Sequence, residues 1–236
     1  MTNPTDYRAC WEEKYERAYA AGKKHWRPEL ATPKPFAAFL EIELAPRPPA
    51  RVLEAGCGDG LNAIFLAQKG YRVTGVDIAE QAVARAREAA VEAAVNVEFL
   101  CTDLAAPLQD LGEPFHLWVD IKTLHTLWDD AKRRTYLRNA YASLRSNGVL
   151  YLQCGLALHD VRDSFPEVFA QLDSATQASA DCLDRDLPPD KRGGIRCETL
   201  DGYCDELCSA GFRILSAQRS ATLAEGWGAT VVALRP

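Results

Sequence analysis

Short apolar runs alternate with segments whose apolar residues recur at helical spacing through the middle of the chain. The first run begins at Val52, and a helical pattern that starts at Leu61 stops at Gly70. A second run over residues 71–76 leads directly to Asp77. This stretch predicts a strand, a turn, a helix and a second strand that ends at an acidic residue.

The same alternation continues to the C-terminus. VEFLCTDL predicts a third strand that ends at Asp103, FHLWVDI a fourth that ends at Asp120, and SLRSNGVLYLQ a turn at 146–148 before a fifth strand. A helix over 199–210 stops at Gly211, and FRILSAQRS and GWGATVVALRP predict two strands joined by a short turn. The predicted fold class is therefore α/β, with a doubly wound, mostly parallel seven-stranded sheet and a C-terminal antiparallel hairpin.

Glycines occupy alternate positions in the turn after the first strand. The string EAGCGDG places Gly56, Gly58 and Gly60 after Glu54, where side chains would block a ligand's approach to the backbone. Asp77, at the end of the second strand, is placed to accept hydrogen bonds from ribose hydroxyls. These features together predict a nucleotide-binding site.

The spacing of the glycines and Asp77 is by itself compatible with two cofactors. Gly58, Gly60 and Ala63 satisfy G-x-G-x-x-A with Asp77 about 20 residues on, which is typical of dinucleotide binding. The full string EAGCGDG, however, resembles motif I of class I S-adenosylmethionine (SAM) dependent methyltransferases, and the resemblance extends over residues 50–155. One departure is Ser-Asn-Gly before the fifth strand, where that family has Pro-Gly-Gly.

The resemblance implies a Rossmann-like fold, SAM as methyl donor and S-adenosylhomocysteine (SAH) as product. It assigns the glycine turn to the methionine part of the cofactor, Asp77 to the ribose, Asp103 to the adenine amino group, and Leu104 or Ile78 to the adenine face. The full set of residues expected to bind the cofactor is Trp26, Glu54, Gly56, Cys57, Gly58, Asp77, Ile78, Asp103, Leu104 and Asp120.

The first fifty residues predict a helical cover for this core. A helix capped by Thr5 or Asp6 runs to Ala21, and four aromatic residues on one of its faces are expected to pack it against the body: Tyr7, Trp11, Tyr15 and Tyr19. The segment CWEEKYERAYAAGKKHWRPELATPKPFAAFL resembles the N-terminal part of thiopurine and tellurite-resistance-like methyltransferases. By that resemblance Trp26 lies near the methionine end of SAM and His25 near the acceptor.

The chain is expected to form a single methyltransferase domain over residues 1–236. Its parts are an N-terminal cover (1–49), a SAM-binding core (50–155), an acceptor-side insertion (156–197) and a last helix with the hairpin (198–236). The insertion is interpreted either as a lid or as a mobile surface segment. Four basic residues in it predict either an acceptor-carboxylate site or a solvated charge cluster: Arg185, Lys191, Arg192 and Arg196.

Histidines are the candidate bases, because imidazole titrates near neutrality. His125, five residues beyond Asp120, is the predicted catalytic base, and the alternative is that its ring packs beside neighbouring apolar residues. His159, after the fifth strand, is expected at the acceptor site, whereas His116 inside the fourth strand is expected to be structural. An Asp-based metal site at Asp120, with Asp129 and Asp130 as the further ligands close in sequence, is not favoured.

Composition and charge restrict the kinds of molecule that the protein is expected to bind. The 236 residues are 47% hydrophobic and carry a net charge of -6 with no Lys/Arg stripe, so a small-molecule substrate is predicted rather than nucleic acid. No apolar run reaches the ~20 residues needed to span a membrane, and MTNPTDYRAC lacks signal-peptide character, so a cytoplasmic protein is expected. Nothing in the sequence sets the oligomeric state.

Eight cysteines in such a protein are expected to be reduced thiols. Their spacing lacks the paired short knuckles of a structural zinc site, so no metal is predicted. A thiophilic ion held by Cys182, Cys197 and Cys204 is the alternative.

These observations predict SAM-dependent methyl transfer to a small molecule, with a thiol or another soft heteroatom favoured by the N-terminal resemblance. An O-, N- or carboxyl-methyltransferase of a secondary metabolite is the alternative within the class. A non-catalytic SAM-binding module and an NAD-dependent oxidoreductase are the alternatives outside it.

Overall fold

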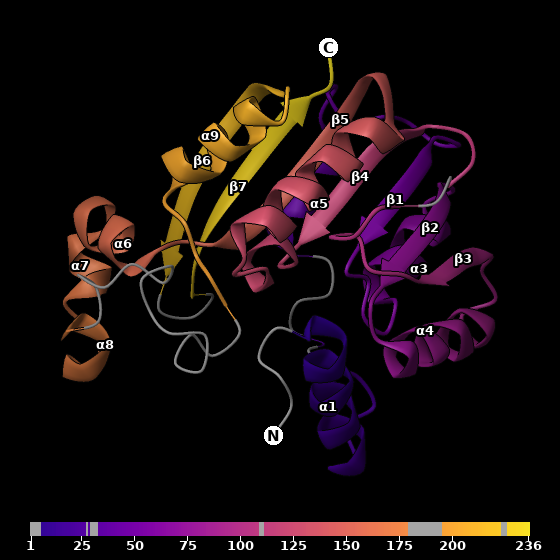
Figure 1. Ribbon diagram of the computed structural model, residues 1–236, viewed down its shortest axis with the longest axis horizontal. Helices are drawn as coiled ribbons and strands as arrows, with labels where there is room; N and C mark the ends of the chain where they lie inside the picture. Colours follow the sequence, from indigo (N-terminus) through magenta and orange to yellow (C-terminus); the bar gives the residue numbers. More distant parts are fainter. Residues whose placement is uncertain (1–5, 27, 29–32, 109–110, 179–194, 223–225) are drawn as a thin grey trace.

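One sheet organises the structure. The computed structural model describes residues 6–236 apart from residues 27, 29–32, 109–110, 179–194 and 223–225. Its strands are β1 (Arg51–Ala55), β2 (Arg72–Asp77), β3 (Val97–Cys101), β4 (Phe115–Ile121), β5 (Leu144–Gly155), β6 (Arg213–Thr222) and β7 (Gly226–Leu234). Their order is β3-β2-β1-β4-β5-β7-β6 (Figure 1). β1 to β5 pair in parallel and β7 runs antiparallel to β5 and β6, which confirms the predicted fold class.

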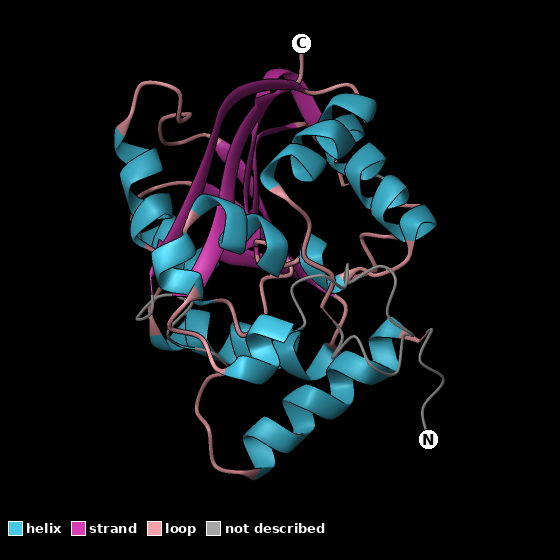
Figure 2. Ribbon diagram, turned by 90° about the vertical axis from the view of Figure 1, so that its left-hand side faces the viewer, coloured by secondary structure: helices cyan, strands magenta, loops and turns pink. Residues whose placement is uncertain are grey.

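Helices cover both faces of the sheet, and each face has its own core (Figure 2). Side chains of a strand alternate between the faces, so Leu53 packs with helices α5 and α9 whereas Val52 packs with α2, α3 and α4. Burial on both faces explains why these strands read as continuous apolar runs. The helices are α1 (Tyr7–Ala20), α2 (Lys34–Glu41), α3 (Leu61–Gln68), α4 (Glu80–Glu92), α5 (Asp130–Ser143), α6 (Leu158–Ser164), α7 (Pro166–Phe169), α8 (Ser174–Ala178) and α9 (Leu200–Ser209).

The turn predicted at 146–148 lies inside strand β5. The strand begins at Leu144, which pairs with Phe115, and the register shifts before Val149 pairs with Leu117. Asn147 has a φ of +60°, and its N–H donates to the carbonyl oxygen of Arg235 at 2.8 Å. The irregularity that the sequence suggested is present, but the backbone remains paired across it.

Helix α1 lies across the end of the sheet to which the parallel strands point (Figure 1). The Asp6 carboxylate caps it by accepting the Ala9 N–H at 3.0 Å. Hydrogen bonds to both ends of the site hold α1 to the body. The Tyr7 hydroxyl accepts the N–H groups of Trp128 and Asp129 at 3.0 and 3.1 Å, and the Glu12 carboxylate accepts the Glu80 N–H at 2.5 Å at the start of α4.

Replacing Tyr7 with phenylalanine is expected to lower the free energy of unfolding by about 1–2 kcal/mol, because two backbone N–H groups lose their acceptor. Urea denaturation measures the change. Tyr19→Phe is the matched control, since the buried Tyr19 hydroxyl has no hydrogen-bond partner in the described part of the chain and its removal should cost nothing. Equal losses in the two variants would mean that the Tyr7 hydroxyl does not anchor α1.

The predicted insertion contains helices α6, α7 and α8, which project beyond the β6 edge of the sheet (Figure 1). Arg185, Lys191 and Arg192 lie outside the described residues. Arg196 is neither solvated nor directed at a ligand: it is 5% exposed and forms ion pairs with Asp130 and Glu198 at 2.5 and 2.8 Å. Those carboxylates explain how a guanidinium is accommodated there.

No described helix is long and apolar enough to cross a membrane.

Candidate functional site

A cavity lies between α1 and the carboxyl ends of the strands. The space between its walls, including open solvent at the mouth, is about 1030 Å³. The N-terminal segment, the β1 and β2 ends and the loops after β3 and β4 contribute its lining. Nine of the ten residues predicted to bind the cofactor line it: Trp26, Glu54, Gly56, Cys57, Gly58, Asp77, Ile78, Asp103 and Leu104.

The glycine turn forms one wall and has no room for side chains. Gly56 has a φ of +65°, and a Cβ there would lie 2.1 Å from Thr123 Oγ1. Gly58 has a φ of +54°, and its Cβ would lie 2.9 Å from the Tyr15 hydroxyl oxygen. The backbone of this turn therefore borders the cavity directly.

Asp77 connects the glycine turn to the next helix. Its two carboxylate oxygens accept the N–H groups of Gly58 and Ala79, both at 2.9 Å. Burial raises its pKa to about 6, although both amide hydrogen bonds favour the ionised form. Each oxygen retains acceptor capacity, so the carboxylate can also receive hydroxyl groups from a ligand in the cavity.

Glu54 lines the cavity from the end of β1 and is 2% exposed. Asn62 and the Ala63 N–H bond to its carboxylate, but Oε2 has no hydrogen-bond partner among the residues that the structure describes. Burial raises its pKa to about 8, so the side chain is protonated at neutral pH. An unpartnered buried oxygen that faces a cavity suits a ligand that brings a hydrogen-bond donor or a positive charge.

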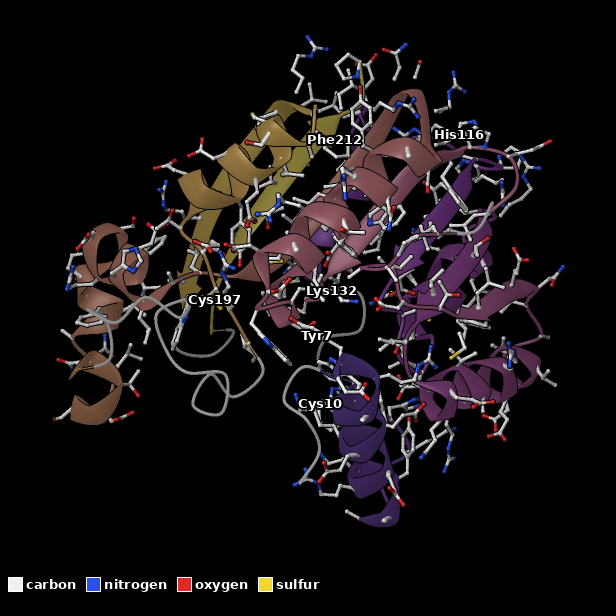
Figure 3. The ribbon with its side chains drawn as sticks, in the orientation of Figure 1. Tyr7, Cys10, His116, Lys132, Cys197 and Phe212 are labelled. Atoms are coloured by element: carbon white, nitrogen blue, oxygen red, sulfur yellow. The ribbon has the colours of Figure 1, made fainter. Side chains whose placement is uncertain are left out.

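Asp103 and Leu104 lie at the other end of the cavity, after β3. The Lys132 ammonium pairs with Asp103 Oδ2 at 2.9 Å, and Oδ1 accepts the Ala105 N–H. Asn139 fixes this loop by donating to the carbonyl oxygen of Leu104 at 2.8 Å. Figure 3 shows Lys132 on α5 close to Tyr7 of α1, at the opposite end of the sheet from His116.

Three aromatic rings close the cavity from the N-terminal side. The ring centroids of Trp11, Tyr15 and Trp26 lie 5.6–6.3 Å apart. The Trp26 N–H donates to Asp59 Oδ2 at 2.7 Å, which ties the segment after α1 to the glycine turn. The aromatic face predicted only to pack α1 thus also lines the site through Tyr7, Trp11 and Tyr15.

Asp120 does not border the cavity, which corrects its predicted role. It is fully buried, and its carboxylate accepts the Tyr136 hydroxyl at 2.6 Å and the N–H groups of Thr123 and Leu124. Burial raises its pKa to about 6. Asp120 therefore shapes the 3-10 helix η2 (Leu124–Thr126) that follows β4.

His125 is buried in η2 and does not line the cavity. Its Nδ1 accepts the Gly155 N–H at 2.9 Å, so the ring attaches η2 to the end of β5. This geometry favours the packing alternative over the catalytic base. His116 Nδ1 accepts the Arg51 N–H at 3.2 Å inside the sheet, in keeping with the structural role expected for it.

The two histidines expected near the acceptor also lie outside the lining. His159 is on α6, in the helices that project past β6, and does not line the cavity. His25 Nδ1 lies 3.5 Å from Asp59 Oδ2, beside the cover rather than in the cavity. Among the described residues no group of three His, Cys, Asp or Glu side chains is placed to hold a metal, and Cys182 lies outside them.

Several lining residues were not predicted. Asp59 stands inside GCGDG, where its sequence neighbours could have indicated a role. Thr123 and Lys122 follow β4, and no motif marks them. Thr123 donates its hydroxyl to the Ala55 carbonyl oxygen at 2.8 Å, a contact between residues 68 positions apart that local sequence cannot reveal.

Part of the chain is similar in sequence to known methyltransferases. Residues 52–148 match the family described as "Methyltransferase domain". A tRNA 5-carboxymethoxyuridine methyltransferase of Escherichia coli (strain K12) is 33% identical over 116 residues, which are 47% of this chain and 44% of that protein. The chain thus spans less than half the length of this relative.

Two solved structures share the fold over most of the chain. The 1,6-didemethyltoxoflavin-N1-methyltransferase of Burkholderia thailandensis, with bound SAH, has a TM-score of 0.68 at 22% identity and covers 99% of this chain and 91% of its own. The magnesium protoporphyrin IX methyltransferase of Synechocystis PCC 6803, with bound SAM, has a TM-score of 0.65 at 20% identity. The match covers 100% of this chain and 98% of that chain.

Proposed function

Because this chain belongs to the class I methyltransferases, we propose that it transfers the methyl group of SAM to a small-molecule acceptor. One observation carries the proposal: the glycine turn, Asp77 and the Asp103–Leu104 loop lie along a single cavity under an aromatic cover. The resemblance to thiopurine and tellurite-resistance-like enzymes stays a prediction, and it supports a thiol or another soft heteroatom as the first acceptor to test.

The chemistry of the lining fits SAM. SAM supplies an activated methyl group on a positively charged sulfonium, so the protein needs mainly to position the two reactants. The backbone at Gly56 and Gly58 holds the methionine part, Asp77 holds the ribose hydroxyls, and Leu104 packs on the adenine. The unpartnered Glu54 oxygen and the rings of Trp11, Tyr15 and Trp26 suit the cofactor's positive charges.

A small molecule is the proposed acceptor, although the Escherichia coli relative acts on tRNA. The net charge of -6 favours a small molecule, because RNA binding requires a basic surface that neutralises phosphates.

Two measurements test the function. Calorimetry should show SAH binding to the intact chain, and methyl-labelled SAM incubated with thiols, phenols, amines and carboxylates should yield a labelled product by mass spectrometry. SAH binding without product from any class would favour the non-catalytic SAM-binding module. Binding of a nicotinamide dinucleotide in place of SAH would contradict the proposal.

A further inference from the structure

Lys122 has a backbone conformation that lysine rarely adopts. It follows β4 directly, lines the cavity and has a φ of +70°. A side chain costs free energy in the left-handed region, so such a residue persists only where its surroundings impose it, and these positions cluster at functional sites. Its N–H donates to the Gln153 carbonyl oxygen at 2.7 Å, which fixes the conformation.

The Lys122 ammonium lies away from the glycine turn. A Cβ built on Gly228 would be 4.0 Å from Nζ, and Gly228 pairs with Gly155 at the carboxyl end of β5. Because the order is β1-β4-β5-β7, Gly228 is three strands from the glycine turn, about 14 Å at the usual strand spacing. The ammonium therefore lies toward β7, on the side of the glycine turn opposite β3 and Asp103 in the sheet order.

The cavity is electrically divided. Four carboxyl-bearing side chains line the end assigned to the cationic cofactor: Glu54, Asp59, Asp77 and Asp103. Among the described lining residues Lys122 is the one with a positive charge, and its ammonium makes no ion pair or hydrogen bond with the part of the chain that the structure describes. An ammonium near a sulfonium repels it, so Lys122 is suited to an anion that arrives with the second substrate.

The described lining offers no uncommitted base. It contains no histidine, and burial keeps Glu54 protonated at neutral pH. The other acidic residues are already engaged: Asp77 accepts two amides, Asp103 pairs with Lys132 and Asp59 accepts the Trp26 N–H. An acceptor whose nucleophile is already ionised needs no base. The charge of Lys122 and the lack of a base in the described lining therefore favour the same class of acceptor.

We propose that Lys122 binds the ionised nucleophile of the acceptor, and that the acceptor is an anion, a thiolate or a carboxylate. This inference rests on the proposed function. The nucleophile's electron pair forms the new bond to the methyl carbon, and the broken sulfur–carbon bond leaves its pair on sulfur. The sulfonium becomes a neutral thioether, the anion becomes a neutral methyl thioether or ester, and no proton is transferred.

The test compares Lys122→Gln and Lys122→Arg with the unaltered protein. Binding is measured by saturation-transfer NMR on the SAH complex, with benzoate as the anionic probe and benzamide as the neutral one. Turnover is measured with labelled SAM, with thiophenol, which is ionised near neutral pH, as the anionic acceptor and aniline as the neutral one. We expect Lys122→Gln to weaken benzoate binding and thiophenol turnover at least about tenfold, while the SAH dissociation constant stays within about twofold. Lys122→Arg should retain most of the benzoate binding and most of the thiophenol turnover, since arginine keeps the positive charge.

Equal losses on the anionic and neutral probes would overturn the proposal, as would failure of benzoate and thiophenol to bind the SAH complex. A loss of SAH affinity in Lys122→Gln would overturn it in favour of a contact to the cofactor's own carboxylate. Failure of the unaltered protein to bind SAH would instead refute the proposed function. Lys122→Gly provides a check on folding: it should raise the melting temperature by about 2–4 °C by relieving the backbone, yet lose benzoate binding.

Discussion

Replacing Asp77 with alanine is expected to weaken SAH binding by about 100-fold. Two charge-assisted hydrogen bonds to ribose hydroxyls, at about 1.5 kcal/mol each, correspond to that factor. The variant also deprives the Gly58 and Ala79 N–H groups of their acceptor, so the glycine turn loses the contact that fixes it beside β2. Titration calorimetry with SAH measures the affinity.

Asp160→Ala is the matched control. Asp160 is 6% exposed, accepts the Leu200 N–H at 2.8 Å and does not line the cavity. Its loss should lower the free energy of unfolding and leave SAH affinity within about twofold, since the ion pair with Arg219 and the amide contact are remote from the site. Unchanged affinity in Asp77→Ala would remove the ribose role, and parallel losses in both variants would trace the effect to folding.

Local sequence accounts for the placement of the glycine turn and Asp77 beside the cavity. Strand β1, the glycine turn, α3 and β2 follow one another over residues 51–77, and apolar periodicity with turn chemistry specifies each. The position of Asp77 follows from that order, because it ends β2 next to the turn. The fold could be predicted for the same reason, as each strand and helix has its own pattern.

The errors arise from contacts between distant residues. Asp77 and Asp120 both stand at strand ends, and local sequence does not separate them. They differ because Tyr136 on α5 donates its hydroxyl to the Asp120 carboxylate. His125 is likewise engaged by the Gly155 N–H, 30 residues away. The position of Lys122 depends on a φ and on a neighbour in β7, neither of which a motif records.

Replacing Glu54 with glutamine is expected to stabilise the protein in a pH-dependent manner. Burial raises the pKa of Glu54 to about 8 from 4.5. Below pH 4.5 the carboxyl group is protonated in both the folded and unfolded chains. Between pH 4.5 and 8 the unfolded chain loses this proton while the folded chain keeps it, so rising pH favours unfolding of the unaltered protein.

Glutamine has the same shape, keeps an acceptor for the Ala63 N–H and does not titrate. The advantage of Glu54→Gln in the free energy of unfolding should therefore grow from pH 4.5 to 8 by about 4 kcal/mol and then level off. Urea denaturation across that range measures it, and Glu98→Gln, at an exposed position on β3, controls for the loss of one negative charge. A difference between Glu54→Gln and the unaltered protein that does not change with pH would mean that Glu54 is ionised in the folded state. The Glu54 carboxylate would then add its negative charge to that of Asp77 beside the glycine turn, even without a ligand.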